Sequence, residues 1–276
     1  MSKLIEKIKQ NSRVVTQPIG FGREAVAPVK PRILLLAAIT RPGEASPPGL
    51  VAGADAALVS LSGSRSDAKT FEKYVDSEVG IPWGGWLAGD KPLGGKQIIA
   101  MGCDFIAFSA DSPLGDMAVE QEAITKAGKK STGAGNLLVL DETVDSSLLR
   151  TVADLPVDAV VVTGKDEFSP ALTWRRLMVY RNYAGIISKP LLVTVPVKIT
   201  AAELQALWEA GVSGIIVNAE AAKAAGVKGL RDVIDNTDFP TRKKHDRVKA
   251  VLPHFGIGVD AKKEAAPDED EEEDDE

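Results

Sequence analysis

Acidic and basic side chains follow several apolar runs of this sequence, at positions where they could act on a bound molecule. Asp141 ends the run at residues 136–140, Asp111 comes two residues after the run 103–109, and Lys165 follows the run 157–163. Two carboxylates can transfer a proton or hold Mg²⁺. A lysine amine can neutralise an anion, and burial can lower its pKa until it attacks a carbonyl. Asp111, Asp141 and Lys165 are therefore the candidate catalytic residues.

Hydroxyl and amide side chains end the same kind of run and could bind a substrate by hydrogen bonds. We take four of them as candidate substrate-binding residues: Ser109, Thr163, Thr194 and Asn218. Two alternatives stay open for the charged residues. Glu142 could join Asp111 and Asp141 in a carboxylate cluster, or Asp141 could instead cap the next helix, and Lys165 could be a solvated loop residue.

A repeated pattern of strand and helix must position these groups. Segments 53–60, 102–109, 156–163 and 211–218 are alike, and their third residues, Asp55, Asp104, Asp158 and Ser213, are 49, 54 and 55 residues apart. A second series of apolar runs begins at residues 31, 82, 136 and 190. Continuous apolar runs are typical of strands covered on both faces, and a glycine before such a run can end a helix. The chain therefore predicts eight strands in four equivalent units.

Helical patterns fill the intervals between the predicted strands. They occupy residues 66–78, 117–126, 145–153 and 170–187, and the pair Thr200 and Glu203 forms a capping box before another helix. Eight alternating strands and helices predict an α/β fold, a (β/α)8 TIM barrel, with an open doubly wound sheet as the alternative. We expect an N-terminal cap at 1–30, which begins with an amphipathic helix, the barrel at 31–258 and a disordered acidic tail at 259–276.

In such a barrel the carboxyl ends of the strands form one mouth, which brings the candidate residues together. There Asp111 and Asp141 would polarise or deprotonate a substrate, directly or through Mg²⁺. Lys165 would neutralise its charge and Asn218 would orient it. Trp86, also at a strand end, would either line this pocket or pack against a helix.

The segment 210–217, with the sequence AGVSGIIV, resembles the last strand of the phosphate-binding group of TIM barrels. That group includes the tryptophan synthase alpha subunit and many flavin mononucleotide enzymes. The resemblance implies a phosphate held by a glycine turn and a short helix, and it makes FMN a possible cofactor beside Mg²⁺. In this chain Asn218, Ala219 and Glu220 stand where the group has its glycine turn.

Composition excludes several other classes of protein. The hydrophobic fraction of 44% is that of a globular protein, and the single Cys103 and the two histidines, His245 and His254, offer neither a zinc site nor a serine triad. The charged N-terminus and the lack of long apolar runs predict a cytoplasmic protein without a membrane partner. Scattered basic residues do not predict nucleic-acid binding, and the oligomeric state stays open.

These features favour a cytoplasmic barrel enzyme that acts on a small anionic or carbonyl-containing metabolite, by lyase-like or related carbon chemistry. A flavin-dependent enzyme is a further possibility under the same fold. The alternative is a catalytically silent barrel that serves as a binding or assembly module.

Overall fold

The computed structural model describes residues 2–12, 32–41, 47–62, 70, 73–74, 80–87, 95–112, 133–164 and 171–240. Contacts within the chain divide it into two units, Met1–Arg242 and Lys243–Glu276. The second unit lies outside the described residues, and so do residues 13–30 of the expected cap and the expected tail.

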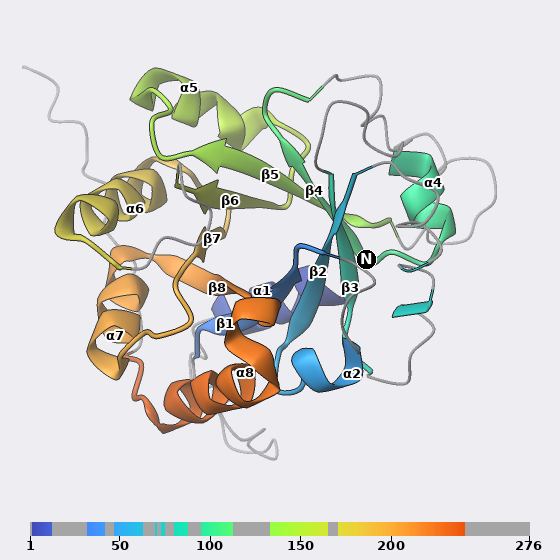
Figure 1. Ribbon diagram of the computed structural model, residues 1–276. Coiled ribbons are helices and arrows are strands. Elements are labelled where there is room, and N and C mark those ends of the chain that lie inside the picture. Colours follow the sequence, from blue (N-terminus) through green and yellow to red (C-terminus); the bar gives the residue numbers. More distant parts are fainter. Residues whose placement is uncertain are drawn as a thin grey trace, which may run out of the picture. The chain divides into compact units, whose positions relative to one another are not determined.

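Eight parallel strands close into a barrel in the order of the sequence, which confirms the predicted fold (Figure 1). The first strand pairs with the last, so the open doubly wound sheet is excluded. The strands are β1 (Leu34–Ile39), β2 (Ala56–Leu61), β3 (Trp83–Leu87), β4 (Phe105–Ser109), β5 (Gly135–Asp141), β6 (Ala159–Thr163), β7 (Leu191–Thr194) and β8 (Val212–Asn218).

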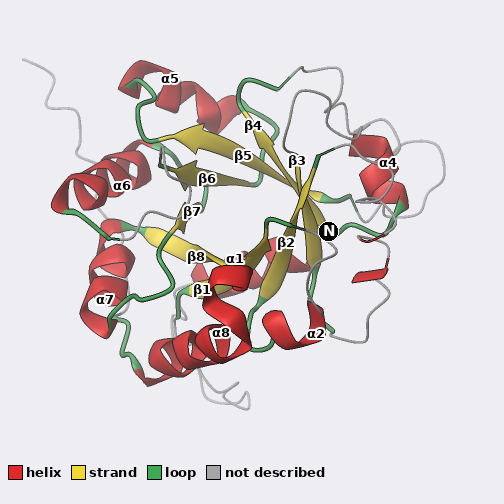
Figure 2. Ribbon diagram, viewed as in Figure 1, coloured by secondary structure: helices red, strands yellow, loops and turns green. Residues whose placement is uncertain are grey.

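The helices lie around the outside of the barrel, except α1, which lies at the amino-terminal end of the inner core (Figure 2). They are α1 (Lys3–Ser12), α2 (Pro47–Leu50), α4 (Gly95–Ala100), α5 (Ser146–Thr151), the 3-10 turn η3 (Val152–Asp154), α6 (Trp174–Ile186), α7 (Ala201–Ala210) and α8 (Ala219–Asn236). The helix expected at 117–126 lies outside the described residues, as does most of the one expected at 66–78. No helix in the described part of the chain is both long and apolar enough to cross a membrane.

Apolar side chains form two cores, because residues alternate between the two faces of each strand. The inner core lies within the barrel and includes Leu36, Leu58 and Leu192. The outer core lies between strands and helices and includes Tyr180 and Leu207. A position on a strand therefore tells whether its side chain points into the barrel.

Helix α1 closes the amino-terminal end of the inner core. It is amphipathic, and its apolar face is buried against that core. Leu4, Ile5 and Ile8 are buried there with the inward side chains of the strands. The carboxylate of Asp104 accepts hydrogen bonds from the backbone N–H groups of Lys3 (2.8 Å) and Leu4 (3.0 Å), which are free donors at the start of the helix. This carboxylate therefore holds the first turn of α1 against the barrel.

The repeated aspartates lie at equivalent places at the amino ends of β2, β4 and β6. The backbone N–H groups of Asp55, Asp104 and Asp158 donate to carbonyls at the start of the preceding strands, each at 2.8 Å. The carboxylate of Asp55 also accepts from the N–H of Leu35, and that of Asp158 from the N–H of Asn136. The sequence repeat thus serves strand pairing at the end of the barrel opposite the expected site.

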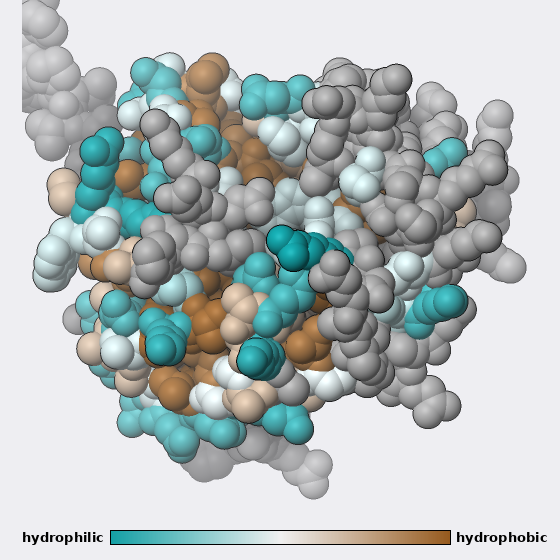
Figure 3. Space-filling model, viewed as in Figure 1, coloured by the Kyte–Doolittle hydropathy of each residue, from teal (hydrophilic) through white to brown (hydrophobic). Residues whose placement is uncertain are grey.

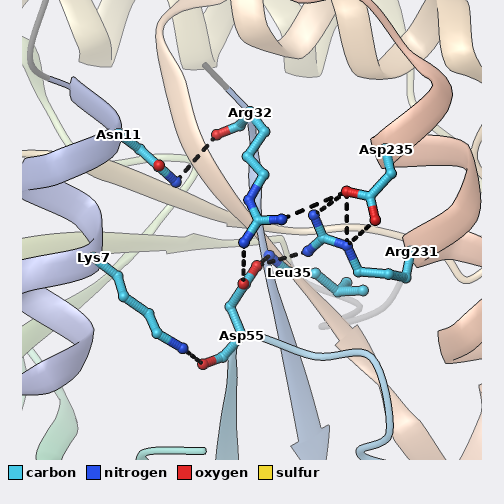
Figure 4. Close-up of polar contacts among 7 residues, drawn as sticks. All are labelled: Lys7, Asn11, Arg32, Leu35, Asp55, Arg231 and Asp235. Carbon is cyan, nitrogen blue, oxygen red and sulfur yellow. Dashed lines mark hydrogen bonds and ion pairs between the residues drawn. The ribbon is translucent and has the colours of Figure 1, made fainter. Parts of the chain in front are cut away.

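Asp55 is also the centre of an ion-pair network (Figure 4). Its buried carboxylate binds Arg32 at 3.1 Å and Arg231 at 2.9 Å, and Arg231 binds Asp235 at 2.6 Å. Lys7 of α1 donates to the backbone carbonyl of Asp55 at 2.7 Å. The network joins α1, the start of β1, β2 and α8 at the amino-terminal end.

Local signals in the sequence explain how two of the helices end or break. The capping box of Thr200 and Glu203 starts α7 as predicted, and Gly211 ends it with a φ of 105°. An L side chain rarely adopts that left-handed conformation, so glycine is required there. Helix α8 breaks at Lys223, whose φ is 55° and ψ is 171°.

Candidate functional site

Polar side chains ring the inside of the barrel at the carboxyl ends of its strands. Each lies two residues beyond an inward-facing position, so the alternation of the strand points it inward as well. We call this set the mouth ring; its members are Thr40, Ser60, Trp86, Ser109, Asp141, Thr163, Thr194 and Asn218. The barrel interior is therefore apolar along its length and polar at this one end.

Asp141, Thr163 and Thr194 are neighbours within the mouth ring. Asp141 and Thr163 are register partners on β5 and β6, and the pairing of Val162 with Val193 on β6 and β7 places Thr163 beside Thr194. Adjacent parallel strands lie about 4.8 Å apart, and paired residues face the same side. One carboxylate and two hydroxyls thus share one level of the mouth.

Thr194 has a buried hydroxyl without a partner in the part of the chain that the structure describes. Its side chain is only 1% exposed, and Oγ1 has no hydrogen-bond partner among the described residues. Leaving a buried polar group unpaired costs about 1 to 3 kcal/mol, so such groups are rare and call for an explanation. A ligand oxygen in the mouth would supply the missing partner.

The backbone around Asp141 is fixed by the barrel wall. The hydroxyl of Tyr183 on α6 donates to the carbonyl oxygen of Asp141 at 2.9 Å, and burial raises the pKa of Tyr183, which keeps it a donor. The side chain of Asp141 is exposed, and one of its oxygens accepts from the N–H of Thr143 at 2.9 Å. Asp141 does not cap α5, because Asp145 does so by accepting from the N–H of Ser147.

Glu142 belongs to the barrel wall and not to a carboxylate cluster. It accepts hydrogen bonds from Nε of Arg176 at 2.6 Å and from the hydroxyl of Tyr180 at 3.2 Å, both on α6. Burial raises the pKa of Tyr180, so its proton stays in place. A Cβ on Gly164 would overlap the guanidinium of Arg176, which would have to move away from its position beside Glu142. These partners hold Glu142 in the wall and argue against the alternative in which it joins Asp111 and Asp141 in a cluster.

Asp111 and Ser109 continue the edge of β4 toward the mouth. The N–H of Ala110 donates to the carbonyl of Val139 on β5, and the N–H of Asp111 donates to the hydroxyl of Ser109 at 3.2 Å. The Asp111 side chain is exposed. Lys165 lies outside the described residues, directly after Gly164. Within the described residues no group of three His, Cys, Asp or Glu side chains could hold a metal ion.

The turn after β8 is occupied by the protein's own side chains. Asn218 caps α8, because its Oδ1 accepts from the N–H of Ala221 at 2.9 Å. The carboxylate of Glu220 accepts from Oγ1 of Thr40 at 2.6 Å and from the N–H of Arg41 at 2.7 Å. The N-terminus of α8 is already capped by Asn218, and the negative carboxylate of Glu220 beside it would repel a phosphate, whether free or part of FMN. The turn after β8 therefore does not fit the phosphate of FMN.

Trp86 lies with the inner core and not against an outer helix. Its side chain is half-buried and packs on the inward-facing apolar residues. The tryptophan at this strand end therefore lines the mouth, as one of the two sequence interpretations expected.

Two residues near the mouth, Tyr183 and Arg176, escaped sequence reasoning, and the partner of a third, Glu220, was not predicted, because these contacts join residues distant in the chain. Tyr183 and Arg176 act on the loop after β5 from α6, at separations of 42 and 34 residues, and Glu220 reaches Thr40 over 180 residues. The pattern of Arg176, Tyr180 and Tyr183 at helical spacing was a usable signal, because it puts three polar groups on the buried face of α6.

Solved structures with this fold include tryptophan synthases, whereas neither a family model nor a curated protein matches the sequence. The tryptophan synthase complex of Pyrococcus furiosus is 12% identical, with a TM-score of 0.52 over 75% of this chain and 97% of that chain. The ligand-free tryptophan synthase of M. tuberculosis is 12% identical, with a TM-score of 0.54 over 86% of this chain and 99% of that chain. Identities this low establish the barrel fold alone.

Proposed function

We propose that the mouth ring is the active site of a barrel enzyme that acts on a small carbonyl-containing metabolite. The single observation that carries the proposal is the buried, unpaired hydroxyl of Thr194 beside Thr163 and Asp141. A site built to hydrogen-bond an oxygen leaves its donor unpaired until that oxygen arrives. The similarity to tryptophan synthases supports this proposal by fold analogy only.

Asp141 is the proposed base. Its carboxylate would take the proton from a hydroxyl on the carbon β to a substrate carbonyl. The hydroxyl oxygen would form a new carbonyl group as the Cα–Cβ bond breaks, and the electron pair of that bond would pass to the first carbonyl as an enolate. The protonated Asp141 would then return the proton to the enolate carbon. The hydroxyls of Thr194 and Thr163 would hydrogen-bond the oxygen on which negative charge develops. This is lyase-like carbon chemistry, and it needs no group beyond the residues named.

A carbonyl compound fits the described mouth better than an anion does. Asp141 is the one charged member of the mouth ring, and it is negative. Lys165, two residues after Thr163, keeps its proposed role of neutralising an acidic group on the substrate. Asp111, exposed at the next strand end, is a proposed second carboxylate, and Ser109 and Asn218 are proposed to orient the substrate from the other side of the mouth.

The alternative is a silent barrel used for assembly. An assembly module has no need for polar groups inside the barrel, where each costs desolvation. The polar mouth ring therefore favours the enzyme.

Binding of carbonyl probes tests the proposal. Dihydroxyacetone, pyruvate and inorganic phosphate are added separately, and melting temperature is measured for the wild type, Thr194→Val, Asp141→Asn and the control Thr151→Val on α5. We expect dihydroxyacetone to raise the melting temperature of the wild type and the control, and to have a smaller effect on the two mouth variants. Equal shifts in all four proteins, or a shift with phosphate alone, would contradict the proposal.

A further inference from the structure

The exposed apolar side chains of the described chain gather on one part of the barrel wall. Its large exposed hydrophobic residues are four, Leu148, Leu155, Trp174 and Met178, with exposed fractions of 60%, 42%, 82% and 71%. They belong to α5, to the residue after η3 and to α6, and α5 and α6 pack against each other. We call these four residues the apolar patch.

The apolar patch is unusual because two neighbouring helices contribute to it on their solvent sides. Trp174 and Met178 are four residues apart on α6 and so lie on the same face, while Tyr180 and Tyr183 of that helix point inward. Single exposed hydrophobic residues are normal, but a contiguous group marks an interaction site. Figure 3 shows hydrophobic residues, in brown, at the surface over α5, at the top of that view.

Opposite charges flank the two ends of the apolar patch. Arg175 follows Trp174 at the start of α6, and Asp154 precedes Leu155 at the end of η3; both are exposed. Helices on a barrel run from the carboxyl ends of the strands toward the amino ends. Arg175 therefore lies near the mouth end of the wall, and Asp154 lies near the opposite end.

We propose that the apolar patch binds a second copy of this chain across a two-fold axis. Such an axis can place Trp174 and Arg175 of one copy against Leu155 and Asp154 of the other. Two-fold contacts occur twice by symmetry, so each dimer would contain two Arg175–Asp154 ion pairs around a shared apolar centre. An arrangement with both signs of charge on one patch is complementary to itself, which is why we assign a second copy and not a different protein.

The four side chains form the centre of the interface and not its whole area. A stable interface buries about 800 Å² per partner, with aromatic anchors at its centre and a polar rim around them. Trp174 is the expected anchor. The proposal is independent of the proposed function, because it involves the outer wall and leaves the mouth ring untouched.

Sedimentation velocity on the full chain is the first test. We expect a dimer for the wild type and a monomer for Trp174→Glu and Met178→Glu, with unchanged circular dichroism because both side chains are already exposed. Lys189→Glu, on the loop after α6, is a matched surface control and should stay dimeric. A monomeric wild type, or a dimer in both patch variants, would overturn the proposal.

A charge exchange identifies the orientation. Arg175→Glu and Asp154→Lys each place like charges across both halves of the proposed dimer, so each variant alone should dissociate at least about tenfold more readily. When the two variants are mixed, the introduced glutamate of one copy meets the introduced lysine of the other, and the wild-type pair forms in the second half. Native mass spectrometry should therefore show mainly the mixed dimer. Equal amounts of all three dimers would contradict this orientation.

Discussion

Glu220 and Thr40 join the last and first strands of the barrel, 180 residues apart, through a hydrogen bond of 2.6 Å. The second carboxylate oxygen of Glu220 accepts from the N–H of Arg41 at 2.7 Å. Both contacts lie just beyond the pairing of Ala38 with Asn218, the last register pair between β1 and β8. One side chain thus extends the closure of the barrel past the end of the sheet.

Glu220→Gln should lower the free energy of unfolding by about 1 to 2 kcal/mol, because hydrogen bonds to a charged acceptor are worth that amount. The amide keeps the size of the side chain but loses the charge and one acceptor. Urea unfolding measures the change, with Glu209→Gln on the exposed side of α7 as the control. An equal effect of the two substitutions would mean that the contact between β1 and α8 adds nothing to stability.

Asp55→Asn should be far more destabilising, by about 3 to 5 kcal/mol, because it removes a buried charge from between two arginines. Asp158→Asn, at the equivalent place in the repeat, weakens one bond among the described residues, that from the backbone N–H of Asn136, and about 1 kcal/mol is expected. Chemical unfolding of the two variants gives the comparison. A similar loss of unfolding free energy in both variants would show that the ion pairs of Asp55 add nothing to stability beyond the backbone hydrogen bond that both aspartates accept.

Protonation of Asp235 should contribute to the pH dependence of the free energy of unfolding. Hydrogen bonds from Arg231 hold the pKa of Asp235 below its usual value. The pair therefore stabilises the fold above the unfolded pKa of about 3.9 and ceases to do so as the pH falls through the lower folded pKa. Asp235→Asn should be less stable than the wild type at neutral pH by about 1 kcal/mol or less, since the carboxylate is half-exposed.

Unfolding of that variant and the wild type across acidic and neutral pH tests this sign. The difference between them should shrink on acidification. A difference that grows as the pH falls would be incompatible with a lowered pKa for Asp235.

Thr194→Val should leave the free energy of unfolding unchanged or raise it, because it removes a buried hydroxyl that has no partner among the described residues. Thr237 provides a matched contrast: it is also buried, but its hydroxyl donates to the carbonyl of Val233 at 2.6 Å. Thr237→Val should cost about 1 kcal/mol. Denaturant titration of both variants checks the contrast, and a loss of stability in Thr194→Val would show that its hydroxyl is paired in solution.

Cys103, the single cysteine, should not react with thiol reagents in the folded protein. Burial raises the pKa of its thiol to about 12, and the thiol lies 2.7 Å from the carbonyl of Phe105. The thiolate is the reactive form, so little of it exists at pH 8. Titration with an aromatic disulfide reagent should count no thiol per native chain and one after unfolding. Rapid labelling of the native chain would mean that β4 opens readily.

Patterns local in sequence predicted the strands, the closed barrel and the start of α7. These features depend on alternation, runs and caps, which involve residues close together in the chain. The repeated aspartates were visible too, but their role was not, because Asp104 acts on α1 at a separation of 101 residues and Asp55 acts on Arg231 at 176. A repeat in sequence shows equivalence of position and leaves the contacts unspecified.

The candidate site was predicted in part for the same reason. Strand ends located Asp141, Thr163 and Thr194 on neighbouring strands of one mouth, since register follows from strand order. Glu142 was grouped with the acids because it is adjacent to Asp141, but adjacent residues on an extended chain point to opposite sides. Arg176, 34 residues later, provides the partner that draws Glu142 into the wall.

The pairing of β1 with β8 also limits the order in which the strands can pair during synthesis of the chain. Neighbouring strands from β1 to β7 can pair as they leave the ribosome, but β1 stays an open edge until residue 218 has been synthesised. Helix α1 precedes all eight strands in the chain and yet must wait as well, because its apolar side chains are buried in the same inner core as Leu192 and Ile216. Helix α1 is therefore synthesised before every strand but can be buried only after the last of them.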